Sequence, residues 1–336
     1  MSKGVQSNTS PDETMRLAVE RFQTRMESSN RQFLQDRIDE IEAMHLSTEE
    51  EKLREMRLYW PDVGIRGCPN HWSDHAPRDI IRRAREEENV SRLEDVKTLY
   101  HELMDGVIPP TLATDKWRQM FLETIQNVCN EAAEHDEEEG EDISIPICEE
   151  LGHFIKYANG VQDPDFRRSG ICPWEPVPPI GIREYAFPDR PTVQPLLSPD
   201  LAESREKLKE YLKENLLDDA FIQGTVDSDL EVKVGFRTGL GSRQERDEWY
   251  STYLYCRRCE DDSDRSHKDC AWRVVILHAD GDNPTPLYGR KPRFDSIPEF
   301  LEWYSSCMDH FDSNRLSRNV RCFYGDDDVS SDGDEL

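Results

Sequence analysis

Residues 294–311 read FDSIPEFLEWYSSCMDHF, and this stretch decides the fold. Ser296 and Glu299 are spaced as a capping box, in which each side chain bonds a backbone N–H of the first helical turn. Apolar residues then recur at helical spacing and form one broad face: Ile297, Phe300, Leu301, Tyr304, Cys307, Met308 and Phe311. A helix with such a face must pack against another apolar surface.

Three stretches before this helix predict the strands that it covers. Leu230–Phe236 alternates apolar and polar residues with the period of a half-buried strand. Trp249–Cys256 is rich in aromatic and β-branched residues, and Ala271–Ala279 has a continuous apolar run, so both also predict strands. Gly239-x-Gly241 resembles half a phosphate loop, but no third glycine or helix start follows, so it predicts a turn.

The N-terminal part of the chain predicts helices. A helix start at Ser10 is followed by apolar residues every three to four positions as far as Ile41. Further helix starts are predicted at Ser47 with Glu50, at Ser91 with Glu94, and at Thr114. We therefore expect an α+β fold: an antiparallel sheet backed by helices, preceded by a mainly helical N-terminal region.

Charge and proline patterns divide the chain into parts. Residues 1–133 form the helical region, and 134–142 (EHDEEEGED) is a predicted acidic linker, because neighbouring like charges oppose a continuing helix. Residues 143–324 form the predicted α+β domain. Residues 325–336 have almost nothing to bury and are predicted to be a disordered acidic tail.

Three further elements are predicted inside the α+β part. A helix begins at Pro146 and stops at Asn159-Gly160. The proline-rich stretch 164–199 holds one short strand at Gly181–Tyr185, and a helix opens at Ser198-Pro199.

Composition narrows the classes of partner and compartment. The 336 residues contain 42 Lys and Arg against 70 Asp and Glu, a formal net charge of −28, which disfavours binding to nucleic acid and to anionic membranes. No apolar run is long enough to span a membrane, and Met1–Pro11 is too polar for a secretory signal. Nine scattered cysteines favour reduced thiols in a cytoplasmic or nuclear protein.

The residues Cys256, Cys259, His267 and Cys270 allow two interpretations. Four possible ligands within fifteen residues could hold one tetrahedral zinc ion and staple the loop between two strands. Alternatively, the spacing is incidental and Cys256 is an ordinary buried thiol at the end of a strand. We favour the second interpretation and assign no catalytic, cofactor or metal residues.

Other candidate sites carry weaker signals. Cys68, His71 and His75 supply only three possible ligands, with Pro69 between them, and are interpreted as a polar loop. His153 lies beside an apolar helix face and is interpreted as structural. Large aromatic residues of the strands are expected to lie mostly in the core, and any that faced solvent would be an anchor for a partner.

The order IPICEELGHFIKYANG, VKVGF, WYSTYLYC, WRVVIL and RFDSIPEFLEWY resembles the SUKH superfamily over roughly residues 143–311. That group includes fungal cell-wall-synthesis regulators and many bacterial immunity proteins. The shared features are a proline-led helix ending in Asn159-Gly160, a curved antiparallel sheet, and the helix start from Phe294 to Leu301. The long proline-rich insert and the helix from Ser198 depart from the pattern.

The resemblance implies a protein that acts by binding proteins, as a scaffold or regulator of stress or cell-wall signalling, with no catalytic residues to carry over. We therefore expect a non-enzymatic, regulatory binding protein with a protein partner and no cofactor. Two alternatives stay open. One is a nuclear adaptor stapled by zinc at Cys256, Cys259, His267 and Cys270, and the other is an enzyme whose site is assembled from scattered residues.

Overall fold

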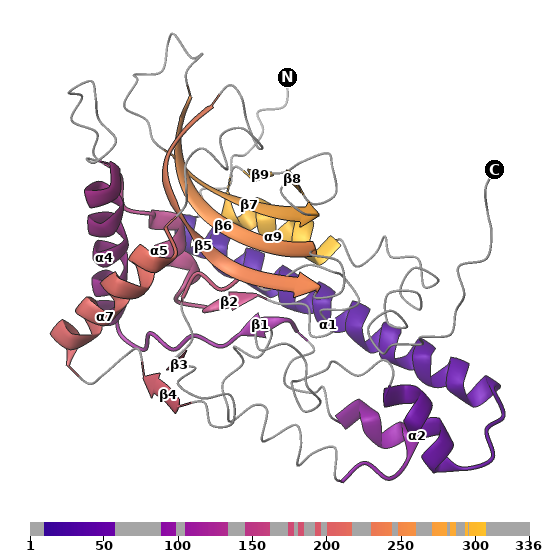
Figure 1. Cartoon of the computed structure of the whole chain (residues 1–336). Helices are drawn as coiled ribbons and strands as arrows, with labels where there is room; N and C mark the ends of the chain where they lie inside the picture. The colour runs from indigo at the N-terminus through magenta and orange to yellow at the C-terminus, as the bar shows by residue number, and fades with distance from the viewer. Residues whose placement is uncertain are drawn as a thin grey trace, which may run out of the picture.

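The computed structural model describes residues 10–57, 89–98, 105–133, 145–161, 174–177, 181–184, 192–195, 200–216, 230–243, 248–259, 271–280, 283–286, 293–294 and 296–306. The fold is α+β, as predicted: helices pack on an antiparallel sheet and a helical region precedes it (Figure 1). The predicted linker 134–142 and tail 325–336 lie outside these residues.

The main sheet has five antiparallel strands in the order β5-β6-β7-β8, with β9 also paired to β7. Their bounds are β5 Leu230–Arg243, β6 Glu248–Cys259, β7 Ala271–Asp280, β8 Asn283–Pro286 and β9 Arg293–Phe294. The three long strands are those that the residue pattern predicts, but β5 is much longer than expected. The sequence analysis did not predict β8 and β9, which have only four and two residues.

The predicted turn at Gly239-x-Gly241 is wrong, because both glycines lie inside β5. Gly239 pairs with Thr252 and Gly241 with Tyr250 on β6. Register shifts between Val232 and Val234 and between Arg237 and Gly239 mark bulges. A bulge bends and twists a strand, and glycine suits the second one, so the strand curves where the sequence predicted it to end (Figure 1).

Helix α9, Ile297–Ser306, lies behind the sheet in Figure 1 and buries Ile297, Phe300, Leu301 and Tyr304. The rest of its predicted apolar face, Cys307, Met308 and Phe311, lies outside the described residues. Phe300 is 0% exposed and its ring lies 5.1 Å from that of Trp174 and 5.4 Å from that of Phe294. Tyr304, one turn later, is 5.7 Å from Phe22 of helix α1. Helix α9 is therefore held between the sheet and α1, as the capping box and apolar spacing predict.

Helix α1, Pro11–Ala43, is about 50 Å long at 1.5 Å per residue and joins two separate cores. Its first half contributes Met15, Ala18, Val19, Phe22 and Met26 to the main core with the sheet, α9 and α4, Asp115–Ala133. Its second half packs on α2, Glu49–Arg57, and on the 3₁₀ helix η1, Leu93–Thr98, through Leu34, Ile38 and Ile41. The main core thus contains residues from both sides of the predicted linker 134–142.

Several helices begin one to three residues away from the predicted start. The N-cap of α2 is Thr48, whose Oγ1 accepts from the Glu51 N–H, in place of Ser47 with Glu50. The N-cap of α7, Leu201–Glu214, is Asp200, in place of Ser198. Ser10, Thr114 and Ser296 do cap their helices: each hydroxyl accepts from the backbone N–H three residues on.

The helix predicted from Pro146 starts later, as α5, Glu149–Phe154. Residues 145–146 are extended because their backbone groups bind other elements. The Ile145 N–H donates to Asn130 Oδ1 at 2.8 Å, and the Pro146 carbonyl accepts from Trp272 Nε1 at 2.9 Å. These bonds tie the start of α5 to helix α4 and to strand β7.

The Asn159-Gly160 pair was predicted to stop this helix, but α5 ends earlier, at Phe154, with its C-cap at Ile155. The buried Asn159 side chain accepts from the Thr111 N–H at 2.9 Å and donates to Thr111 Oγ1 at 2.6 Å. Gly160 belongs to strand β2, Gly160–Val161, which pairs with β1, Val107–Ile108. A Cβ on Gly160 would lie 2.4 Å from the Trp174 carbonyl oxygen, so this close approach requires glycine.

A second two-stranded sheet lies in the proline-rich stretch. Strand β3, Gly181–Glu184, is the predicted one, and its partner β4, Thr192–Pro195, was not predicted. Among the helices described, none is both long and apolar enough to cross a lipid bilayer.

We predict that Gly160→Ala destabilises the protein by about 3 kcal/mol, because the new methyl group overlaps backbone that cannot move aside cheaply. The matched control is Gly152→Ala in helix α5. Its Cβ would meet only the end of the Leu122 side chain, at 2.9 Å, and alanine favours helix, so the change should stay within about 1 kcal/mol. Urea unfolding of both variants measures the difference, and equal stabilities would contradict the prediction.

Candidate binding surface

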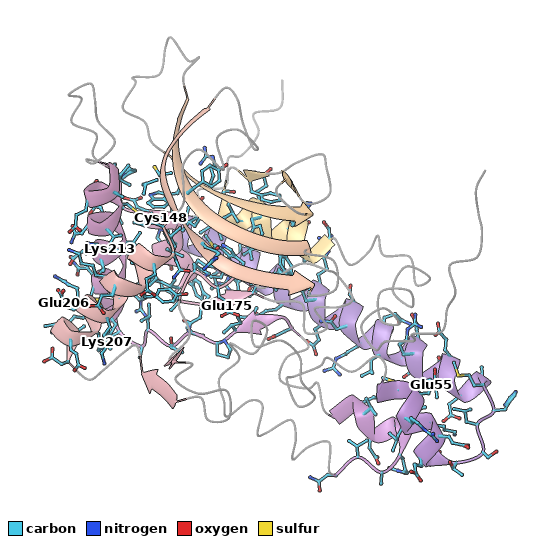
Figure 2. All side chains as sticks on the ribbon, viewed as in Figure 1. Glu55, Cys148, Glu175, Glu206, Lys207 and Lys213 are labelled. Carbon is cyan, nitrogen blue, oxygen red and sulfur yellow. The ribbon has the colours of Figure 1, made fainter. Side chains whose placement is uncertain are left out.

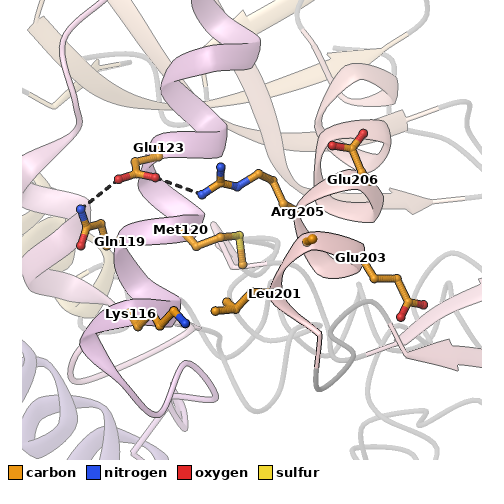
Figure 3. Close-up of a pocket in the computed structure, with 9 residues that line it drawn as sticks. Lys116, Gln119, Met120, Glu123, Leu201, Glu203, Arg205 and Glu206 are labelled. Carbon is orange, nitrogen blue, oxygen red and sulfur yellow. Dashed lines mark hydrogen bonds and ion pairs between the residues drawn. The ribbon is translucent and has the colours of Figure 1, made fainter.

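Helices α4 and α7 lie side by side at the edge of the molecule and leave a groove between them (Figures 1 and 3). The buried stripe of α4 is Met120, Phe121, Thr124, Ile125, Val128, Cys129 and Ala133. Helix α7 buries Ser204, Leu208 and Leu212, which are spaced four residues apart and so share one face. The small side chains Ser204 and Thr124 are 0% and 2% exposed, so the two helices pack closely against the main core.

Ion pairs cross between the two helices above this core. Arg205 of α7 binds Glu123 of α4 at 3.1 Å, and Glu123 also accepts from Gln119 at 2.9 Å (Figure 3). Further along, Glu131 binds Lys209 at 2.5 Å and Lys213 at 2.9 Å. The pairs advance along both helices together, so α4 and α7 run in the same direction. The hydrogen bond from Lys209, and then that from Lys213, lower the pKa of Glu131.

The first part of the groove has a volume of about 820 Å³. Apolar groups come from Met120, Leu201 and Ala202, and charged groups surround them: Lys116, Glu123, Glu203, Arg205 and Glu206. Most of these charged side chains are exposed, so the cavity opens to solvent. Figure 2 places Glu206, Lys207 and Lys213 on α7.

A second hollow of about 470 Å³ continues along the same two helices. Its lining is polar: Thr124, Asn127, Asn130, Glu131, Arg205, Glu206 and Lys209. Arg205 and Glu206 line both hollows, so the two are parts of one groove. We call the two together the α4–α7 groove.

Three polar side chains in this groove have no hydrogen bond or ion pair to another described residue. These are the exposed Lys116 in the first hollow, Glu206 at the junction of the two hollows, and the exposed Asn127. In contrast, Arg205 and Glu123 form an ion pair with each other. A ligand in the groove therefore meets one carboxylate, one ammonium group and one amide that bind no other described residue.

The four residues of the zinc hypothesis are not brought together in the part of the chain that the structure describes. Cys256 is 0% exposed in the main core, opposite Val234 and Trp272 on the neighbouring strands. Cys259 ends β6, and His267 and Cys270 lie outside the described residues. Among described side chains, no group of three or more His, Cys, Asp or Glu is placed to hold a metal ion.

The other candidates have structural surroundings or lie outside the description. Cys68, His71 and His75 fall in 58–88, which is not described. Of the strand aromatics, Tyr255 is buried and Trp272 bonds the Pro146 carbonyl.

Asp12 joins the start of α1 to the end of α5. Its carboxylate accepts from Lys156 Nζ at 2.6 Å and from the Tyr157 hydroxyl at 3.0 Å, and it lies 3.1 Å from His153 Nδ1. The Lys156 bond, helped by those from Tyr157 and His153, lowers the pKa of Asp12 to about 2. His153 thus has the structural surroundings that the sequence analysis predicts.

Glu150 has a raised pKa for a structural reason. It is half-buried in the first turn of α5, and its carboxylate accepts from the Ile297 N–H at 2.8 Å at the start of α9. Burial raises the pKa of Glu150, while the Ile297 N–H and the charge of Arg273 oppose the change. The carboxylate therefore caps α9 and fixes it to α5.

Cys129 on α4 and Cys148 at the N-cap of α5 are buried thiols. Burial raises the pKa of each to about 12. A thiolate is the reactive form of cysteine, so neither residue has the character of a nucleophile.

Comparison of the whole chain with family models, with curated proteins and with solved structures finds no match. The α4–α7 groove was not anticipated from the sequence. Both helices were predicted, but no local pattern indicates that residues 116–131 and 201–209 face each other.

We predict that Asp12→Asn lowers stability near neutral pH by about 1 kcal/mol or less, since the carboxylate is 41% exposed and water screens it. A lowered carboxyl pKa stabilises the fold above the unfolded pKa of about 4, and this stabilisation is lost as the pH falls toward 2. In urea unfolding, the difference in the free energy of unfolding between Asp12→Asn and wild type should therefore shrink to zero as the pH falls through that range. Asp36→Asn removes the same charge from an exposed position of α1 and should show no such gap.

We also predict that iodoacetamide leaves Cys129 and Cys148 unlabelled in the folded protein near pH 8. At a pKa of about 12, roughly one thiol in ten thousand is ionised at that pH. Peptide mass mapping reads the labelling, and guanidinium-unfolded protein serves as the control in which both are labelled. Labelling within minutes in the folded state would show that these thiols are accessible.

Proposed function

We propose that this protein is a regulatory protein that binds other proteins and carries out no reaction of its own, and that a segment of a partner protein docks in the α4–α7 groove. The observation that carries the proposal is the groove itself: an apolar floor between charged rims, on two helices anchored in the main core. Protein interfaces combine an apolar centre with a polar rim in the same way.

The composition of the groove favours a peptide over a small apolar ligand. A volume of about 820 Å³ falls within the range of small-molecule sites, but those are lined mainly by apolar and aromatic side chains. Here three carboxylates and two cations surround three apolar residues, and none of the described residues that line the hollow is aromatic. A partner chain supplies both apolar and charged groups, which matches this lining.

The resemblance to the SUKH superfamily supports the same function. The helix start at Ser296, the sheet before it and the Asn159-Gly160 pair are the features on which the resemblance rests, and each has a defined structural role in the fold. We accordingly propose a scaffold of the kind found in stress or cell-wall signalling, acting in the cytoplasm and also in the nucleus. The buried thiols Cys129, Cys148 and Cys256 are consistent with a reducing compartment.

We predict that Ala202→Arg abolishes partner binding, because a long charged side chain would fill the floor of the groove. Ala202 is exposed and arginine is a good helix former, so the fold should be unaffected. The matched control is Ala43→Arg, the same substitution at an exposed position at the far end of α1. The measurement is quantitative mass spectrometry of proteins captured by each full-length variant, followed by titration of the purified partner.

We expect wild type and Ala43→Arg to capture the same partner in equal amounts and Ala202→Arg to capture none of it. In the titration, the purified partner should bind wild type and Ala43→Arg with the same affinity and should not bind Ala202→Arg. Equal binding by all three variants would remove the groove from the proposal. A reaction catalysed by the purified protein and lost with a groove variant would replace the proposal by an enzymatic one.

A further inference from the structure

The length of the groove sets the size of its occupant. From Lys116 to Glu131 the groove follows α4 for fifteen residues, or about 22 Å at 1.5 Å per residue. An extended chain rises about 3.3 Å per residue, so six or seven residues would fill it.

The chemistry of the groove changes along its length. The first hollow provides the apolar groups of Met120, Leu201 and Ala202. The junction provides the Glu206 carboxylate, and the second hollow provides the Asn127 amide. An amide can donate and accept, which suits the backbone of an extended segment, whose N–H and C=O groups are unpaired. A helical segment would have its backbone groups already satisfied.

The spacing of these groups fixes a sequence pattern. Leu201 and Glu206 are five residues apart on α7, or about 7.5 Å along the helix axis. In an extended chain, residues two positions apart are about 6.6 Å apart and point to the same side. For a segment that runs in the same direction as α7, an apolar side chain over Leu201 therefore places the side chain two positions later next to Glu206.

The charged groups of the groove and the net charge of the whole chain both act on a side chain at that position. Two of the three carboxylates in the first hollow form ion pairs, Glu123 with Arg205 and Glu203 with Lys207. The carboxylate that forms none is Glu206, and the cation Lys116 lies in the first turn of α4. The formal net charge of −28 attracts basic segments and repels acidic ones. A lysine or arginine is thus the side chain that complements Glu206.

We infer that the α4–α7 groove binds an extended segment of a partner protein in which an apolar residue is followed, two positions later, by lysine or arginine. The inference rests on the proposed function and adds the chemistry of the partner. It assigns the apolar residue to the first hollow, the basic side chain to Glu206 and the segment's backbone to Asn127.

The test measures binding of fluorescein-labelled hexapeptides to the full-length protein by fluorescence polarisation. The parent peptide is Ser-Leu-Ser-Lys-Ser-Ser. Companions move the lysine to one or three positions after the leucine, or replace it with glutamate. We expect the parent to bind about fivefold tighter than each companion, as one solvent-exposed charge pair would give, and to weaken with added salt.

A charge swap separates recognition from a structural effect. Glu206→Lys should reverse the preference, so that the glutamate peptide binds better than the lysine peptide. Glu210→Lys is the matched control: it changes the same net charge on an exposed position of α7 that does not line the groove, and it should leave the preference unchanged.

The outcomes are distinguishable. A reversed preference with Glu206→Lys alone supports the inference. Binding that Ala202→Arg abolishes but that ignores the lysine spacing or the Glu206→Lys swap overturns the inference and leaves the proposed function standing. If no peptide of the series binds, but Ala202→Arg still abolishes binding of the partner, the inferred sequence pattern of the segment is wrong. If Ala202→Arg changes neither the binding of the partner nor that of the peptides, both the proposed function of the groove and the inferred sequence pattern fail.

Discussion

The structure depends on burying the aromatic face of helix α9. Phe300 and Tyr304 are each 0% exposed, and rings from different elements lie against them. The sheet and Trp174 cover Phe300, while Phe22 of α1 lies against Tyr304. Fully burying side chains of this size is worth about 2–3 kcal/mol each, so the first half of α1 and the sheet are held in place by the same few rings.

This arrangement determines what the rest of the chain can do. The first half of α1 lies in the main core and its second half supports a separate small core with α2 and η1. The backbone bonds at Ile145 and Pro146 tie α4 and β7 to the start of α5. With their apolar stripes buried, α4 and α7 keep their charged faces in solvent, because unpaired charges cannot be buried cheaply. The groove lies between those charged faces.

Local patterns predicted much of this fold. The capping residues Ser10 and Ser296 and the periodic apolar residues after them marked α1 and α9, and the strands β5 to β7 were evident from alternation and aromatic content. Such signals come from residues close together in the sequence. The late start of α5 was missed because it depends on Asn130 and Trp272, which are distant in the sequence. The two glycines in β5 were misread because a bulge and a turn favour the same residue.

The candidate site shows the same limit more strongly. Leu201, Arg205 and Glu206 look like ordinary surface residues of an amphipathic helix. They gain significance only from their position opposite Met120 and Glu123, which no local pattern encodes. The Cys/His spacing was a stronger signal in the sequence, yet Cys256 is a buried core residue.

Site-specific photo-crosslinking in cells measures whether a partner segment lies in the α4–α7 groove. A photoreactive amino acid replaces Ala202 in one sample and Ala43 in another, and mass spectrometry identifies the crosslinked peptides. We predict that position 202, and not 43, crosslinks to one partner at an apolar residue two positions before lysine or arginine. Crosslinks from both positions to the same proteins, or none that are specific to 202, would show that the groove does not hold the partner.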